Sequence, residues 1–132
     1  MIDKKKYSAL LFIMAFFMLT SCQNDQSPEQ TFSHHVFFWL HNPDNPDDRA
    51  EFEKGIQDLL EVPQIQSYHF GVPAETGHRD VVEDSYTYSY QVFFEDKESH
   101  DIYQEHPIHQ EFINDYQHLW KKVVVYDAVR ED

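Results

Sequence analysis

Residues 32–40 read FSHHVFFWL, a stretch dominated by β-branched, aromatic and apolar side chains. A loop that contains Pro43 and Pro46 follows directly, so the stretch predicts a β-strand that ends at Leu40. Large apolar side chains fall on both faces of this strand. We therefore expect both faces of its sheet to be covered.

The next segments alternate between helical and extended patterns. Asn45 is a suitable N-cap and Pro46 suits the first helical position, so a helix is expected to begin here and to end before Pro63. Its apolar stripe is formed by Phe52, Ile56, Leu59 and Leu60. A second strand is predicted over residues 65–72 and a third over residues 86–94.

The third predicted strand carries three tyrosines at alternating positions. Because side chains alternate along a strand, Tyr86, Tyr88 and Tyr90 are expected on one face. Such a row suits the lining of a barrel or an interface. Its apolar rings and polar tips would also suit an aromatic ligand.

The last third of the chain predicts a broken helix and a final strand. Asp96 can cap the helix, Pro107 interrupts it, and the strand is expected over residues 123–129. The apolar stripe after the break comprises Ile108, Phe112, Ile113, Tyr116, Leu119 and Trp120. The order β-α-β-β-α-β predicts a ferredoxin-like α+β fold with helices on one face. A second copy is the simplest cover for the other face, which predicts a homodimeric α/β barrel.

Composition limits the classes of function. The chain has 132 residues, enough for one domain, with 10 Lys and Arg against 24 Asp and Glu, a net charge of −14. This charge argues against a nucleic-acid partner, because phosphate backbones would be repelled. The single cysteine excludes an intrachain disulfide framework and any multi-cysteine metal site.

The N-terminus has the pattern of a secretory signal. Lys4–Lys6 precede an apolar run over residues 10–19, which is too short for a comfortable transmembrane helix of about 20 residues. The string Leu-Thr-Ser-Cys at residues 19–22 resembles the lipobox of bacterial lipoproteins, which implies that Cys22 is lipidated. An uncleaved signal anchor is the alternative.

This resemblance divides the chain into a signal peptide (1–21), a polar tether (22–31) and a domain (32–132). Removal of the signal leaves 7 basic and 23 acidic residues, a net charge of −16. The expected location is the cell envelope, with a lipid bilayer as partner through Cys22. Gln23 supplies no acidic inner-membrane retention signal, which is compatible with the outer membrane of a cell with two membranes.

The domain resembles the stress-responsive A/B-barrel (Dabb) family. The resemblance rests on residues 35–40 (HVFFWL), Gly71, residues 92–94, residues 125–127 and, most specifically, residues 103–109. The last of these read YQEHPIH and fit the family string Y-x-x-H-P-x-H. In a plant polyketide cyclase of this family, a tyrosine and a histidine of the string form an acid–base pair. The resemblance implies that Tyr103 and His109 occupy these two roles.

Two functions remain open. The first is a non-catalytic dimer that binds a small apolar or aromatic molecule, with ligand contacts from His35, Tyr86, Tyr88, Tyr90 and His106. The second is a cyclase-, isomerase- or lyase-like enzyme. In it, the His109 imidazole, with a pKa near about 6.5, takes a proton and Tyr103 donates a hydrogen bond. Tyr103 and His109 could instead close the barrel mouth. Monooxygenase chemistry, known in other dimeric α+β barrels, has no signature here beyond the shared fold.

The sequence supports a metal or cofactor site less well than it supports a ligand-binding or acid–base site. His106 and His109 lie three residues apart, and His34 and His35 could add ligands or form a polar cap, but no spacing fixes a third ligand. Acidic residues at 44, 47, 48 and 51 lack the spacing of a calcium loop and suit a helix start better. We therefore predict no metal and no cofactor.

Overall fold

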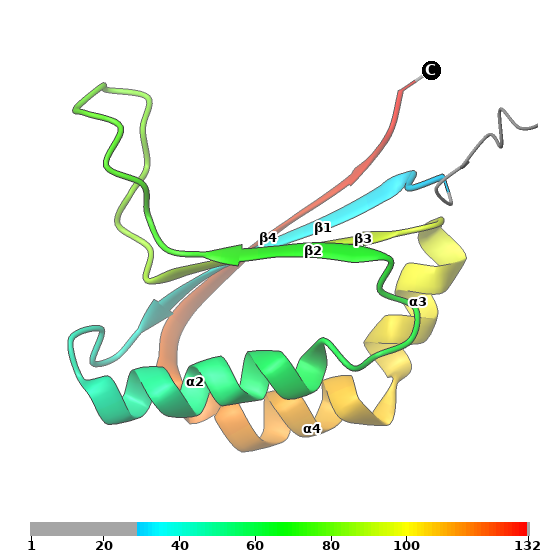
Figure 1. The fold of residues 1–132 in the computed structure, drawn as a ribbon, viewed down its shortest axis with the longest axis horizontal. Coiled ribbons are helices and arrows are strands. Elements are labelled where there is room, and N and C mark those ends of the chain that lie inside the picture. The colour runs from blue at the N-terminus through cyan, green and yellow to red at the C-terminus, as the bar shows by residue number, and fades with distance from the viewer. Residues whose placement is uncertain (1–28, 132) are drawn as a thin grey trace, which may run out of the picture.

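The computed structural model describes residues 29–131, which form one antiparallel sheet with helices packed on one side (Figure 1). The strands are β1 (Phe32–Leu40), β2 (Ser67–Gly71), β3 (Tyr88–Phe94) and β4 (Trp120–Val129), in the spatial order β2-β3-β1-β4. Each neighbouring pair is antiparallel. The ferredoxin-like α+β fold predicted from the sequence is confirmed.

Three helices cover the same face of this sheet. Helices α2 (Pro46–Leu59) and α4 (Pro107–Tyr116) lie side by side, and α3 (Lys97–Glu105) stands at one end of them (Figure 1). A short 3₁₀ turn, η1 (Gln117–Leu119), leads from α4 into β4. Among residues 29–131, no helix has both the length and the apolar character needed to span a bilayer.

Both predicted helix caps are confirmed. The Asn45 side chain accepts hydrogen bonds from the backbone of Asp47 and Asp48, and Pro46 occupies the first helical position of α2. The Asp96 Oδ1 accepts a hydrogen bond from Ser99 N at 2.8 Å and so begins α3. These caps satisfy backbone N–H groups that have no partner within their own helices.

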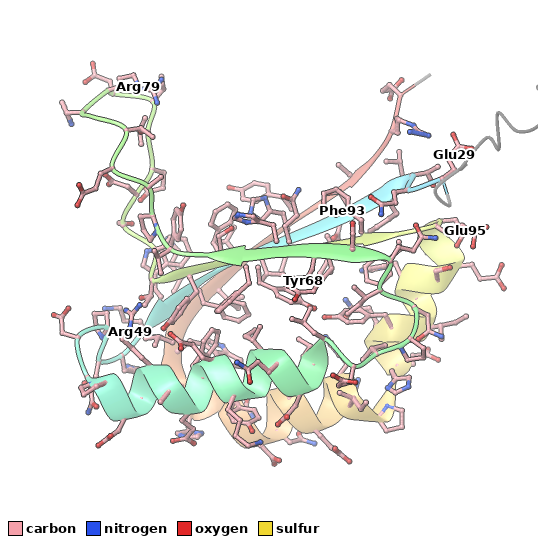
Figure 2. The ribbon with its side chains drawn as sticks, viewed as in Figure 1. Glu29, Arg49, Tyr68, Arg79, Phe93 and Glu95 are labelled. Carbon is pink, nitrogen blue, oxygen red and sulfur yellow. The ribbon has the colours of Figure 1, made fainter. Side chains whose placement is uncertain are left out.

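The core lies between the helices and the sheet face that they cover. Alternate β1 residues point into it, and Phe38 packs its ring 4.9 Å from Phe52 and 5.2 Å from Trp120. The opposite sheet face, here called the open face, carries the half-buried side chains of His35, Phe37, Trp39 and Phe93. Figure 2 shows Phe93 on the open side of the sheet and Tyr68 on the helix side. Figure 1 shows no helix over the open face among residues 29–131.

The prediction that Tyr86, Tyr88 and Tyr90 share one face of the sheet is wrong for Tyr86. Tyr88 and Tyr90 are buried under the helices, but Tyr86 precedes β3 and lies on the open face, 4.8 Å from the ring of Phe37. The chain bends at Thr87, whose backbone N–H donates to Phe38 O and whose hydroxyl accepts from Leu40 N. This bend interrupts the strict alternation on which the prediction relied.

The prediction that the last helix extends to Trp120 is also wrong. It is the first residue of β4, where it pairs with Leu40, and α4 ends at Tyr116. The Trp120 ring still stacks on Phe112 at 5.6 Å. The apolar packing was therefore predicted correctly, although a 3₁₀ turn and a strand replace the last turn of helix.

Candidate functional site

A cavity of about 180 Å³ lies between the covered sheet face and helices α3 and α4. Its walls are mainly apolar, with side chains from the sheet and from the helices, including Val36, Phe38, Leu59, Phe112, Ile113, Trp120, Val123 and Val125. Its polar groups are His34, Tyr90, Tyr103, Gln104 and His109. Val123 and Val125 on the edge strand β4 are 44% and 46% exposed, so the cavity opens beside this strand.

The break between α3 and α4 brings Tyr103 and His109 together. His106 has an extended backbone, and its Nδ1 accepts a hydrogen bond from Ile108 N at 3.2 Å, which caps α4 directly before Pro107. The two helix ends then place the Tyr103 and His109 rings 4.8 Å apart, tilted by 59°. The His106 cap therefore stabilises the break between the two helices.

His109 has the protonation state and the free nitrogen that a base requires. Burial lowers its pKa, and nearby His34 and His100 act in the same direction, while the Gln104 backbone opposes them only in part. The imidazole is therefore neutral at neutral pH. Its Nδ1 is buried and makes no hydrogen bond among residues 29–131, and the His109 side chain lines the cavity, so a small rotation of the ring would turn this nitrogen toward a ligand.

Tyr103 is suited to donate a hydrogen bond and not to act as a phenolate. It is 1% exposed, and burial raises its pKa well above the ordinary value. Its hydroxyl lies 3.3 Å from the Tyr90 hydroxyl, whose pKa burial also raises. The two phenols therefore remain protonated and form a neutral polar pair at the cavity wall.

His34 adds a second polar pair to the same end of the cavity. Its Nδ1 lies 2.6 Å from Asp127 Oδ1 on β4, directly opposite in the strand register. Burial lowers the pKa of His34, although the Asp127 carboxylate opposes this shift. The His34 ring lies 5.9 Å from that of Tyr103, so this pair can influence the groups around the cavity.

The residues predicted to contact a ligand lie in four different places. Tyr90 lines the cavity together with the predicted acid–base pair. Tyr88 is a core residue, stacked between Phe52 and Phe70 with its hydroxyl donating to Glu53. His106 caps α4. The predicted lipidation site, Cys22, lies outside the described residues.

His35 and Tyr86 lie on the open face, away from the cavity. The His35 Nε2 is 2.8 Å from the Ser89 hydroxyl, and its ring lies 4.2 Å from that of Phe37. Tyr86 contributes to a separate hollow of about 250 Å³ on this face, together with Phe37, Trp39, Glu83, Lys122, Val124 and Tyr126. Two of the predicted ligand contacts therefore lie on the side of the sheet opposite to the cavity.

Three further cavity residues have polar side-chain atoms and are not among the predicted site residues. Gln104 lies within the family string between Tyr103 and His106, but the string does not specify its position. The helical pattern predicts only core packing for Trp120. The sequence predicts His34 only as a possible metal ligand or polar cap, although strand alternation places it on the same face as Val36 and Phe38.

The comparison with protein families identifies one match. The profile described as the stress-responsive A/B-barrel domain matches residues 32–130, which include β1, the helix break and β4. No curated protein matches the chain.

Solved structures with the same fold come from plants and bacteria. A protein from Arabidopsis thaliana is 24% identical, with a TM-score of 0.64 over 76% of this chain and 96% of its own. A dimeric ferredoxin-like protein of unknown function from Thermobifida fusca is 16% identical, with a TM-score of 0.61 over 77% and 92%. The hydroxynitrile lyase from Passiflora edulis is 18% identical, with a TM-score of 0.63 over 80% and 96%. At these identities the likeness shows the fold alone.

Proposed function

Because the chain belongs to the stress-responsive A/B-barrel domain family, we propose that it is an envelope-tethered homodimer that binds a small apolar or aromatic molecule. The carrying observation is the cavity of about 180 Å³ beneath the sheet. Ligand sites are typically apolar hollows with a few convergent polar groups, and this one has hydrogen-bonding groups from Tyr103 and His109.

Ligand binding can be measured through Trp120, which lines the cavity. In a Trp39→Phe background, Trp120 is the remaining tryptophan of the chain, so its fluorescence reports on the cavity when a panel of small aromatic compounds is titrated. Val125→Phe narrows the cavity mouth and should weaken binding at least about tenfold. Val129→Phe on the same strand, outside the cavity lining, is the matched control. Equal affinity of the two variants would exclude this cavity as the binding site.

The second candidate is acid–base catalysis by Tyr103 and His109. The specific observation is the 4.8 Å separation of their rings, together with a His109 Nδ1 that has no hydrogen-bond partner in the part of the chain that the structure describes. His109 would take a proton from a hydroxyl or from carbon next to a carbonyl, and Tyr103 would hydrogen-bond the oxygen that gains charge. The lyase among the structural relatives makes cyanohydrins a reasonable first substrate class, whereas polyketide thioesters are made inside cells and would seldom reach an envelope protein.

A proton-transfer role predicts a loss of turnover that exceeds the loss of binding. His109→Gln should lower kcat by about 10²–10⁴-fold, while Tyr103→Phe should lower it without abolishing ligand affinity. His118→Gln, on an exposed histidine of η1, is the control. Wild-type turnover in His109→Gln would exclude His109 as the base, and the absence of turnover by the unmodified chain would leave the non-catalytic binding function as the remaining candidate.

The envelope tether is proposed from the sequence around Cys22. The full chain should sediment with membranes and remain there after high-salt washing, because acyl chains hold it by apolar burial. Cys22→Ala should release it or block its processing. Retention of the processed Cys22→Ala chain in washed membranes would contradict lipid attachment, and retention of an uncleaved chain would indicate a signal anchor.

The homodimer is proposed from the open face of the sheet. Phe37, Trp39 and Tyr126 form an aromatic surface that a second copy could cover by packing sheet against sheet. The relative from Thermobifida fusca is described as dimeric and ferredoxin-like. A domain of this size also buries a modest share of its surface alone, so pairing would add stability.

A further inference from the structure

A cluster of potential metal ligands lies beside the Tyr103–His109 pair. His34, His100 and Asp127 each offer one ligand atom, and these atoms all lie within 4.8 Å of one another. We propose that the three residues bind a divalent transition-metal ion of the zinc class. This site does not depend on the proposed function, because ion binding is measured without any substrate.

The fold orients the three side chains from three different elements. His34 on β1 and Asp127 on β4 are register partners, and His34 Nδ1 lies 2.6 Å from Asp127 Oδ1. His100 comes from α3, and its ring stacks on Phe32 at 4.5 Å and meets Phe94 edge-on at 5.5 Å. Packing therefore fixes the histidine rings before an ion arrives, which lowers the entropy lost on binding.

The donor set suits zinc better than calcium or magnesium. Two imidazole nitrogens and one carboxylate oxygen are typical of zinc sites, whereas calcium and magnesium prefer oxygen ligands alone. Three protein ligands leave a fourth tetrahedral position for water or a ligand oxygen. Tetrahedral ligands at the Zn–N distance of about 2.0–2.1 Å lie roughly 3.3 Å from one another, so the His34–Asp127 pair at 2.6 Å would separate slightly and the widest pair would close by at most roughly 1.5 Å. Asp127 lies on an exposed edge strand and can make much of this movement.

His100 has partners available for whichever ring nitrogen does not bind the ion. Its Nε2 lies 3.2 Å from the Gln104 amide, and its Nδ1 lies 3.5 Å from Asp101 Oδ1. The same Nδ1 is buried and makes no hydrogen bond to any other of the described residues. Metal-bound imidazoles usually donate their second N–H to such an outer partner, so Gln104 or Asp101 would orient His100.

The position of the cluster connects it to the cavity. His34 lines the cavity, and the His34 and His100 rings lie 5.9 and 6.4 Å from that of Tyr103. An ion here would present its fourth coordination position near the end of the cavity that Tyr103 occupies. The net charge of −14 would also concentrate cations around the chain. The competing role is structural, with Asp127 only orienting His34 through their hydrogen bond.

Ion binding is tested on the full chain, purified in mild detergent without a polyhistidine tag. Zinc is titrated by calorimetry and in competition with a chelator, and cobalt is used as a visible probe of coordination. We expect one tight zinc ion per chain and the intense visible bands of tetrahedral cobalt with nitrogen and oxygen ligands. Zinc should also raise the Tm of the chain. The absence of saturable one-to-one binding would overturn the proposal.

Variants distinguish the cluster from adventitious surface binding. Asp127→Asn and His100→Gln should each weaken zinc binding at least about tenfold, because even outer-sphere substitutions at metal sites cost about 10–100-fold. The matched control is a second histidine–carboxylate pair, His118 and Glu51, whose Nε2 and Oε1 lie 3.4 Å apart on the surface. His118→Gln and Glu51→Gln should leave the affinity unchanged. Equal losses in both pairs, or wild-type affinity in folded Asp127→Asn and His100→Gln, would overturn the assignment.

Discussion

The two faces of the sheet are built from the same strands but differ in what completes them. On the covered face, Val36, Phe38 and Leu40 are almost fully buried against helices of the same chain. On the open face, Phe37 and Trp39 alternate with them along β1 but remain half-buried. Both of their rings pack edge-on against the ring of Tyr86. One chain therefore completes the first face, whereas the second has aromatic surface left to pair.

This difference also separates the chemistry. The Tyr103–His109 pair, the Tyr90 hydroxyl and the His34–Asp127 pair all lie on the covered side, within or beside the cavity. The open face offers aromatic rings and the Lys122 ammonium, 4.0 Å from the Trp39 ring centre. A catalytic or binding site from which water must be excluded suits the covered side, and a protein–protein interface suits the aromatic open face.

The largest expected effect contrasts two adjacent phenylalanines of β1. Phe38→Ala should lower the free energy of unfolding by about 3–5 kcal/mol, because Phe38 is buried against Phe52, Phe112 and Trp120. Phe37→Ala on the open face should cost about 1 kcal/mol within a monomer. Denaturant unfolding at several protein concentrations measures both. Only the Phe37→Ala effect should vary with concentration, because it alone removes part of the proposed dimer interface.

The second prediction concerns the dimer directly. Phe37→Asp places a charge at the centre of the open face, so it should convert a dimer into a folded monomer, as measured by light scattering of the chain that begins at Cys22. Ile102→Asp changes an exposed apolar residue on α3 and should leave the mass unchanged. A wild-type protein that scatters as a stable monomer would contradict the proposed dimer.

Much of this contrast could be predicted from the sequence because its signals are local. The apolar alternation of residues 32–40, the Asn45–Pro46 helix start and the Pro107 break each act within one turn or one strand. The family string placed Tyr103 and His109 together, and the structure brings their rings to 4.8 Å. Local signals of this kind survive folding because tertiary packing agrees with them.

The missed features depend on contacts between distant residues. Tyr86 turns to the open face because Thr87 is held by Leu40, 47 positions away in the sequence. His34 meets Asp127, 93 positions later, only through the pairing of β1 with β4. His100 joins them because α3 packs over Phe32. No spacing within a single element predicts such a cluster.

A smaller effect is expected for two hydrogen bonds near the end of β1. The buried Thr87 hydroxyl accepts from Leu40 N at 3.0 Å, whereas the exposed Ser85 hydroxyl accepts from Trp39 Nε1 at 2.9 Å. Thr87→Val should cost about 1–3 kcal/mol, because it leaves a buried N–H without a partner. Ser85→Ala should cost less than about 0.5 kcal/mol, since water replaces the lost partner. Similar losses in thermal unfolding would show that the end of β1 is equally solvated on both sides.

The smallest expected effect is a change in how the free energy of unfolding depends on pH. It involves one histidine on each side of the sheet, His109 and His35. Burial lowers the pKa of His109 on the covered side and of His35 on the open side, the latter with nearby His69 and His34 acting in the same direction. Below pH of about 6.5 the unfolded chain therefore binds more protons than the folded chain, and stability falls as the pH decreases further.

The two histidines should differ in how this fall responds to protein concentration. His109→Asn should flatten the fall equally at all concentrations, because its surroundings belong to one chain. His35→Asn should flatten it more at high concentration, because a second copy on the open face would bury His35 further. His78→Asn, on a fully exposed side chain, is the control. Urea unfolding between pH 5 and pH 8 measures all three. A His35→Asn effect that is independent of concentration would show that nothing covers the imidazole on the open face, which leaves Phe37 and Trp39 without the sheet-to-sheet partner that the dimer requires.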